Sequence, residues 1–536
     1  MVRRRHHRSA RTQPLDRLAL AVIVGLTLIL GLLVLSGDHA TARVRNFTWQ
    51  DRQVGAEDRA FLLTFSRPMD PASVEQNLTL DPPLPGKVSW AGRRMAYTLT
   101  EPLPYGKAFT VSLGTARDRY AEAKAEASRF EPFQGQFETR PRAFLYIGVE
   151  GDEANRLVLA DLSSQERIIL TPKNLSVVAF EPYPLGDKVL FSATNTERDD
   201  SLLNQQIYTV TTGITPRPPA DILAAPPPLW RRFLPQQTGT TSGKLDLILD
   251  NNTYQNLKFD LSPDGQIIVV QRANQQDPAD FGPWLVRAGA APQPIETEPG
   301  GDFLIAPDSQ SLLLLQGEGT AIIDLSDNNS RGPRQPLDFL PNYGRVLDLA
   351  DDGTAAAMVN FNQDDPEKRF IESLFLVTNQ GGEEELLQVT GQILEAQFDP
   401  AEQVLYVLAS QLVDAASTDD ILPTDGYVEQ PLLLAITLAN GTVNPLLRLP
   451  QQRIHMSVAP DGRSLLLDLT DQTASTAAEA GAKIWHLPLI DQPTVSADPL
   501  GTAADNAPDA DSPAATPALA DPEVFPFSGI EATWLP

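Results

Sequence analysis

Short apolar segments alternate with turn residues along most of this chain, and one such pattern recurs from residue 177 onward. Each copy has an apolar strand, a turn of Pro, Asp or Gly residues, and a second apolar strand. A further strand follows each hairpin, and four strands in roughly 40–50 residues are typical of a β-propeller blade. The copies are Val177–Ala193, Leu257–Ala273, Phe303–Gly317, Val346–Phe361, Glu395–Ser410 and His455–Leu469.

The turns of these copies point to tight hairpins. In Pro263–Gly265 and Pro460–Gly462, proline presets φ, aspartate bonds its own backbone and glycine accepts a positive φ. Both turns resemble the hairpin of the WD40-like propeller repeat typified by TolB. The resemblance covers about residues 145–490 and implies a β-propeller, but no activity, because propellers host unrelated functions. The turn residues are Gly186, Gly265, Ser309, Gly353, Glu402 and Gly462.

Residues 44–140 alternate with a different spacing, and Pro- or Gly-containing turns separate short strands that suggest a β-sandwich. Phe65–Asp70, Val88–Trp90 and Pro104–Lys107 resemble the bacterial Ig-like domain of cell-surface proteins, although residues 120–128 depart from it. The resemblance implies a spacer or adhesion module, and we expect Phe65, Trp90 and Phe109 in its core. The predicted strands are Ala60–Phe65, Leu78–Leu80, Lys87–Trp90, Met95–Leu99, Ala108–Leu113 and Phe133–Thr139.

The N-terminal region predicts a membrane anchor. Leu18–Leu35 is uncharged and apolar, and six arginines precede it. Positive charge stays on the cytoplasmic side, so residues 1–17 are expected inside, 18–36 across the membrane, and the bulk of the chain outside. The alternative is a cleaved signal peptide, with a cleavage site at Ala40–Ala42. Both interpretations export the remainder.

The C-terminal region predicts how the propeller closes. Residues 143–490 are assigned to the propeller, but Phe144–Pro172 supplies only three strands of its first blade. Residues 491–522 are rich in Ala, Asp and Pro and predict a disordered linker. We expect the aromatic segment 523–536 to provide the missing strand beside Phe144. The predicted fold is therefore all-β with seven blades, or six as the alternative.

Charge and composition narrow the function classes. The net charge is −27, and the first 42 residues carry +4, so the remainder carries about −31. Such a surface repels nucleic acid, and no nucleic-acid partner is expected. There is no cysteine, which excludes thiol nucleophiles, disulfides and cysteine-ligated metals.

No residue pattern predicts catalysis, a metal site or a cofactor. Beyond the predicted anchor there are three histidines, and His455 and His486 lie in apolar strands, where structural roles are commoner than metal ligation. Gly239–Lys244 has the wrong spacing for a phosphate loop. Carboxylates are abundant, so a glycosidase pair stays open, without any pair being identifiable.

One segment stands out as a candidate binding site. Trp230, Arg231, Arg232 and Phe233 form a basic aromatic cluster in an acidic domain, with packing against the propeller as the alternative. The sequence therefore predicts a membrane-anchored, extracytoplasmic binding or scaffold protein of the bacterial cell envelope that recognises a protein, peptide or glycan. The alternative is an envelope hydrolase acting on glycans or peptides at the propeller channel.

Overall fold

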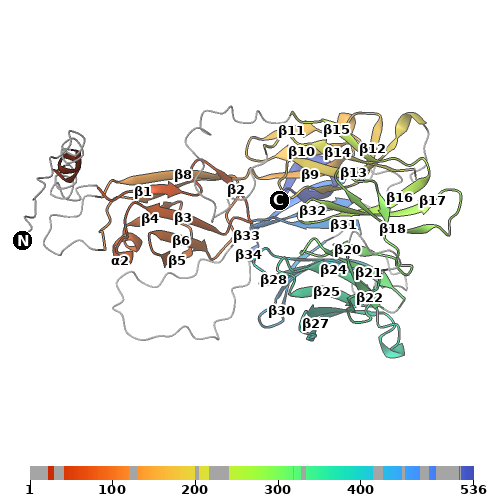
Figure 1. Cartoon of the computed structure of the whole chain (residues 1–536). Coiled ribbons are helices and arrows are strands. Elements are labelled where there is room, and N and C mark those ends of the chain that lie inside the picture. The colour runs from red at the N-terminus through yellow and green to blue at the C-terminus, as the bar shows by residue number, and fades with distance from the viewer. Residues whose placement is uncertain are drawn as a thin grey trace, which may run out of the picture.

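The computed structural model shows an all-β protein in two parts, a β-sandwich and a ring of small sheets (Figure 1). The sandwich lies between the N-terminal helical segment and the ring. The structure describes residues 22–28, 41–119, 130–198, 204–215, 241–317, 319–326, 334–414, 427–449, 453–470, 482–490, 518–519 and 521–536.

Residues 22–28 are the described part of the predicted membrane segment, and they are helical. Of the helices in the described ranges, none has both the length and the apolar character needed to cross a membrane. Residues 1–17 and the rest of 18–36 lie outside the described residues.

The sandwich consists of two four-stranded sheets. A short helix, α2 (Pro71–Glu75), follows β3. The first sheet has the order β1 (Val44–Phe47), β3 (Ala60–Phe65), β6 (Arg94–Leu99), β5 (Gly86–Ala91). The second has the order β2 (Gln53–Val54), β8 (Phe133–Thr139), β7 (Ala108–Leu113), β4 (Leu78–Asp81).

Alternation of apolar and polar residues builds the sandwich core. In β3, every second side chain is buried, and Phe61, Leu63 and Phe65 are fully enclosed. Phe109 of β7 faces them from the other sheet. Trp90 stacks on Phe65 at 5.8 Å between ring centroids, at the edge of the core rather than within it. All six predicted strands are present, and the structure adds β1, β2 and α2, which were not predicted.

Seven four-stranded antiparallel blades follow among the described strands. The first three are β35–β9–β10–β11, β12–β13–β14–β15 and β16–β17–β18–β19. Their bounds are β9 (Ala143–Gly148), β10 (Leu157–Asp161), β11 (Glu166–Ile169), β12 (Leu175–Pro182), β13 (Lys188–Asn195), β14 (Gln206–Thr211), β15 (Leu245–Leu249), β16 (Tyr254–Leu261), β17 (Ile267–Asn274), β18 (Phe281–Arg287), β19 (Gln293–Pro294) and β35 (Glu523–Trp534).

The remaining blades are β20–β21–β22–β23, β24–β25–β26–β27, β27–β28–β29–β30 and β31–β32–β33–β35, and β34 adds to β33. Their bounds are β20 (Phe303–Ile305), β21 (Ser311–Gln316), β22 (Gly319–Asp324), β23 (Asp338–Phe339), β24 (Arg345–Leu349), β25 (Ala355–Asn360), β26 (Ile371–Thr378), β27 (Glu383–Phe398), β28 (Val404–Asp414), β29 (Tyr427–Thr437), β30 (Thr442–Arg448), β31 (Arg453–Val458), β32 (Ser464–Thr470), β33 (Lys483–Ile490) and β34 (Ala518–Leu519).

Buried apolar clusters join each blade to the next around the ring. The clusters contain, in order around the ring, Leu145 with Phe191, Leu190 with Phe259, Val269 with Leu314, Met358 with Leu340, Val359 with Val407, Leu408 with Met456, and Leu466 with Trp534. The last pair connects the seventh blade to the first, so the strands form a closed ring. The cluster between blades four and five is the smallest, with three buried residues.

Two strands each belong to two blades. The first half of β35 pairs with β33 of blade seven, and the second half pairs with β9, with Trp534 opposite Phe144. This is the pairing that the sequence predicts for the tail, although the second role of the strand was not foreseen. Strand β27 joins blades five and six in the same way. A glycine lies at each transfer, because a Cβ at Gly391 or Gly529 would collide with the adjoining strand.

The six predicted turn residues all have positive φ, between 57° and 70°. Four are glycine, for which this backbone is unstrained. The other two use their side chains against a neighbouring turn. Ser309 Oγ accepts a hydrogen bond from Asp264 N at 3.0 Å, and Glu402 Oε1 accepts one from Asp352 N at 2.9 Å.

Deleting Phe525–Pro536 should open the ring. The deletion removes two large aromatic side chains from the core, including Trp534, and exposes the edges of β9 and β33. We expect a loss of several kcal/mol in the free energy of unfolding, together with aggregation. Thermal melting and light scattering measure both. A truncated protein that melts like the full chain and stays monomeric would contradict closure by β35.

Candidate functional site

The sandwich covers one face of the ring, and Arg140 anchors it there. The Nη1 atom of Arg140 donates to the carbonyl oxygens of Pro184, at 3.2 Å, and Pro536, at 3.0 Å. Its Nη2 atom pairs with the carboxylate of Glu57. Because Pro536 follows β35, this arginine ties the sandwich directly to the closing segment of the ring.

Two further contacts join the sandwich to hairpin turns on the same face. Tyr105 N donates to Asp461 Oδ2 at 3.2 Å, and Arg59 Nη2 donates to the carbonyl oxygen of Pro400 at 3.4 Å. Asp461 belongs to the turn of blade seven, and Pro400 to that of blade six. Burial raises the pKa of Tyr105 to about 12, so its hydroxyl stays neutral at physiological pH.

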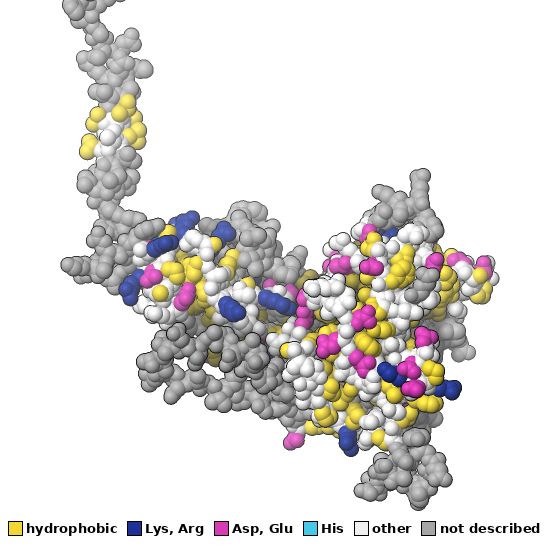
Figure 2. Space-filling model, turned by 90° about the horizontal axis from the view of Figure 1, so that it is seen from below, with side chains coloured by type: hydrophobic (Ala, Val, Ile, Leu, Met, Phe, Trp, Pro, Cys, Tyr) yellow, Lys and Arg dark blue, Asp and Glu magenta, His cyan; other side chains and the backbone are white. Residues whose placement is uncertain are grey.

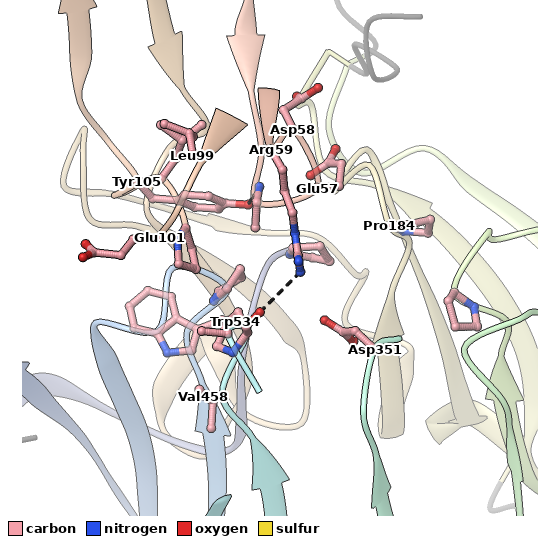
Figure 3. Close-up of a pocket in the computed structure, with 18 of the residues that line it drawn as sticks. Glu57, Asp58, Arg59, Leu99, Glu101, Tyr105, Pro184, Asp351, Val458 and Trp534 are labelled. Atoms are coloured by element: carbon pink, nitrogen blue, oxygen red, sulfur yellow. Dashed lines mark hydrogen bonds between the residues drawn. The ribbon is translucent and has the colours of Figure 1, made fainter. Parts of the chain in front are cut away.

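A cavity of about 1050 Å³ lies between the sandwich and the turns. Figure 3 shows Arg59 reaching from the sandwich towards the propeller, with Asp351, Val458 and Trp534 on the propeller side. The volume is at the upper end of ordinary ligand pockets. Residues of both parts line it, among them Glu57, Asp58, Arg59, Glu101, Tyr105, Pro184, Asp264, Asp351, Gln397, Pro400, Ser457, Pro460 and Trp534.

The cavity is acidic. Five carboxylates line it, and Arg59 is its one cationic lining residue among those described. Burial raises the pKa of Asp351, against the opposing effect of Arg59. Burial also raises the pKa of Glu57, which Arg140 opposes. The site therefore disfavours additional negative charge and would be stabilised by a cationic group.

Beneath the cavity, side chains on the innermost strands connect neighbouring blades. In most blades, the side chain five residues before the positive-φ turn residue accepts a hydrogen bond from the backbone N–H of the innermost strand of the next blade, and we call this contact the inter-blade latch. Five latches are present: Glu181 to Leu261 N at 2.7 Å, Asp260 to Ile305 N at 2.5 Å, Asp348 to Phe398 N at 2.7 Å, Gln397 to Val458 N at 2.9 Å and Ser457 to Trp534 N at 3.1 Å.

At the two remaining junctions between blades, the residue at the acceptor or donor position cannot form the latch. Between blades four and five the acceptor position is Leu304, which has no polar side-chain atom. Between blades one and two the donor position is Pro182, which has no N–H. The pattern is thus visible in the sequence, at the residue five places before each turn residue.

Carboxylates on the innermost strands serve as hydrogen-bond acceptors in the ring. Burial raises the pKa of Asp348 to about 7 and that of Asp260 to about 6, and both accept backbone hydrogen bonds. The hydrolase alternative needs a pair of carboxylates in acid and base roles. The bonds of these buried carboxylates to neighbouring blades give them a structural task, and no acid–base pair is distinguished among them.

The two histidines of the propeller have structural partners. His455 Nδ1 lies 3.4 Å from Glu395 Oε2. Burial lowers the pKa of His455, but Glu395, Asp468 and Glu531 outweigh it and raise the pKa to about 10. His486 lies against Arg142, at 2.7 Å between Nε2 and Nη2, and burial with Arg142 lowers its pKa to about 4.

The predicted binding cluster of Trp230, Arg231, Arg232 and Phe233 lies outside the described residues. Its flanking segments are described. Thr212 N donates to Asp187 O at 2.9 Å, and Thr211 Oγ1 donates to Thr241 O at 2.6 Å. Both flanks therefore lie beside the turn of blade two, whose Pro184 lines the cavity. Sequence reasoning missed the cavity itself, because its residues come from many segments that lie far apart in the chain.

Comparison of this chain with known proteins finds only distant similarities, all of them to solved structures. No protein-family model matches the chain, and no curated protein matches it. Similar solved structures include TolB from Acinetobacter baumannii, at 11% identity and TM-score 0.36, covering 70% of this chain and 81% of that one. An oligogalacturonate lyase from Vibrio parahaemolyticus has 9% identity and TM-score 0.42, covering 66% and 91%. The periplasmic gluconolactonase of Pseudomonas aeruginosa has 13% identity and TM-score 0.38, covering 65% and 92%.

Nothing about activity or ligands follows from likenesses at this level. The propeller architecture rests on the strand order of the ring itself. The resemblance of residues 44–140 to the Ig-like family stays a prediction.

Replacing Asp348 with Asn should change how stability depends on pH. The folded-state pKa of about 7 exceeds the ordinary value of 3.8, so the folded protein keeps a proton that the unfolded chain has lost. The contribution of Asp348 to the free energy of unfolding is therefore fully present below about pH 4, falls as the pH rises to about 7, and is constant above that.

Asn keeps an oxygen acceptor for Phe398 N and cannot ionise. The melting temperature of the wild type, relative to Asp348→Asn, should therefore fall between about pH 4 and about pH 7. Asp246→Asn, at an exposed carboxylate of β15, is the matched control and should show no such trend. Parallel melting profiles for the wild type and Asp348→Asn would contradict the assignment.

Proposed function

We propose that this chain is a membrane-anchored, extracytoplasmic binding protein of the bacterial cell envelope, and that the cavity under the sandwich binds a cationic peptide segment of its partner. The observation that carries the proposal is the cavity of about 1050 Å³ built jointly by the two parts. A ligand there would touch both the sandwich and the ring.

The charge of the cavity supports a cationic ligand. Asp58 and Asp351 line it, and neither forms an ion pair with a described residue at 4 Å or less. Prolines from several turns and the ring of Trp534 supply apolar surface beside them. A peptide with Lys or Arg side chains on an extended backbone suits this combination of carboxylates and flat apolar surface.

The charge distribution of the whole molecule agrees with this preference. Residues 41–140 contain 14 Lys and Arg against 12 Asp and Glu, and residues 1–40 carry +4, so the remaining residues 141–536 carry about −33. In Figure 2, Lys and Arg side chains lie mainly over the sandwich and Asp and Glu side chains mainly over the propeller, with a few of the opposite sign on each. The acidic ring would attract a cationic partner to the face that the sandwich covers.

Exposed arginines support the proposed membrane orientation. Five exposed arginines lie around the segment from Thr64 to Asp70, through backbone hydrogen bonds or strand pairing at that end of β3. They are Arg43, Arg93, Arg94, Arg117 and Arg119. Arg59, which reaches the cavity, lies at the other end of β3. The arginine-bearing end is therefore away from the propeller and nearest to the predicted anchor, where anionic headgroups would attract it.

The cluster Trp230–Phe233 belongs to the same proposal. Its flanks lie beside the turn of blade two that lines the cavity. We propose that a partner whose segment enters the cavity also contacts this cluster.

A peptide-binding assay tests the ligand class. Full-length protein in lipid nanodiscs is titrated with fluorescent peptides of alternating Lys and Ala, or Glu and Ala, and anisotropy is recorded. The Lys peptide should bind at least about tenfold more tightly, and added salt should weaken it. Asp58→Asn with Asp351→Asn should weaken Lys-peptide binding by about fivefold to tenfold, because two attractive charges are lost.

Asp246→Asn with Asp338→Asn is the matched control, since it removes two exposed carboxylates that do not line the cavity. It should leave the affinity within about twofold. Equal binding of the two peptides, or equal effects of the two double variants, would refute a cation-selective cavity.

Fractionation tests the anchor. The chain should remain with the membranes after lysis, and protease added from outside should digest all but the first ~40 residues. A variant without residues 1–36 should be released. Recovery of wild-type protein in soluble form, beginning at Arg43, would instead show that the apolar segment is a cleaved signal peptide.

A further inference from the structure

The junction between blades four and five differs from the other junctions of the ring. Its apolar cluster has three buried residues, and the latch is missing because Leu304 occupies the acceptor position. A separate pocket of about 220 Å³ opens at this junction. The junction between blades one and two also lacks a latch, but a large apolar cluster fills it.

Two buried polar groups line this pocket without a hydrogen-bond partner among the described residues. Thr320 is 2% exposed, and its Oγ1 atom is unpaired. The Nε atom of Arg345 is also buried and unpaired. Each such group costs free energy comparable to a lost hydrogen bond, so a pair of them in one pocket points to a missing acceptor.

Among the described residues, Arg345 has no carboxylate partner, in contrast to the other cation of the pocket. Its Nη2 atom donates to the carbonyl oxygens of Ile393, at 3.1 Å, and Leu394, at 3.2 Å, which fixes the guanidinium. It influences the carboxyl of Glu372 electrostatically, but no ion pair joins the two. The other cation, Lys258, is paired with Asp302.

The second carboxylate of the pocket, Glu395, is also engaged. It accepts a hydrogen bond from Met456 N at 2.9 Å and lies beside His455. Arg345 is therefore the group in the pocket that an added anionic group would neutralise.

The remaining wall is apolar. It consists mainly of Leu304, Leu313, Leu315, Val346 and Leu347. An inorganic anion would leave this surface uncovered, whereas an uncharged hydrocarbon would leave Arg345 without an acceptor. A molecule with one anionic group and a short aliphatic body satisfies both parts of the pocket.

We propose that the pocket between blades four and five binds a small aliphatic carboxylate, held by Arg345 and Thr320 through its carboxylate and by the leucine wall through its chain. The guanidinium matches the planar geometry of a carboxylate, and the threonine hydroxyl supplies a second donor. The volume of 220 Å³ exceeds the roughly 150 Å³ that holds benzene in an engineered cavity, so a chain of about six carbons fits. This site is separate from the proposed peptide cavity and does not depend on it.

Hexanoate, hexanol and hexylamine are the probes. Full-length protein in nanodiscs is titrated by calorimetry, and empty nanodiscs are titrated in parallel to subtract partitioning into lipid. Hexanoate should bind with one site per chain and a Kd on the order of 1 mM, as expected for so small a ligand. Hexanol should bind at least about tenfold more weakly, and hexylamine should not bind.

Arg345→Gln should weaken hexanoate binding at least about tenfold, and Thr320→Val about threefold to fivefold. Val346→Phe fills the pocket while retaining both polar groups, and it should abolish binding even if Arg345→Gln disturbs the junction. Arg369→Gln, at an exposed arginine outside the pocket, is the control and should bind like the wild type. Equal affinities for the three probes, or hexanoate binding unchanged in both Arg345→Gln and Val346→Phe, would overturn the proposal.

Discussion

Closure of the ring by β35 is the contact on which the propeller depends. One strand completes the last blade with its first half and the first blade with its second half, so it leaves neither β33 nor β9 with an open edge. The latch from Ser457 to Trp534 N then fixes the same strand from the side. Arg140 extends the connection to the sandwich through the carbonyl oxygen of Pro536. The closure of the ring, the attachment of the sandwich and the wall of the cavity therefore all depend on the same few C-terminal residues.

Buried carboxylates connect the blades of this strongly acidic protein. Glu181, Asp260 and Asp348 each accept a backbone N–H from the next blade, which compensates part of the cost of their burial. Where this acceptor is replaced by Leu304, the junction is looser and a pocket appears. The same repeated position thus sets both the rigidity of most junctions and the opening at one.

The sequence predicts the elements whose chemistry is local. Strands such as Ala60–Phe65 follow from alternation, and the turn residues follow from the hairpin pattern, including the unusual Ser309 and Glu402. The second role of β35 could not be inferred, because it depends on a partner in blade seven.

The cavity and the pocket between blades four and five are harder still to predict. The cavity brings Arg59 and Trp534 together from opposite ends of the chain, and nothing in their local sequence signals this. The acceptor position of the inter-blade latch recurs before each hairpin turn. The apolar Leu304 at this position therefore shows in the sequence that one latch is missing, but only after the structure has identified the latch. The unpaired Thr320, by contrast, becomes evident only from three-dimensional burial.

The pairing of β35 with β9 also constrains the order of events during biosynthesis. Gly148 and Gly529 are partners about 380 residues apart, and the strand carrying Gly529 is made after every other strand of the ring. Until it arrives, the nascent first blade presents an open edge to its surroundings. The ring therefore assembles as a unit only once β35 has been synthesised, and contacts of such sequence separation form slowly. A protein built in this way depends on protection of that edge, by chaperones or by the sandwich beside it, for the whole time between the two events.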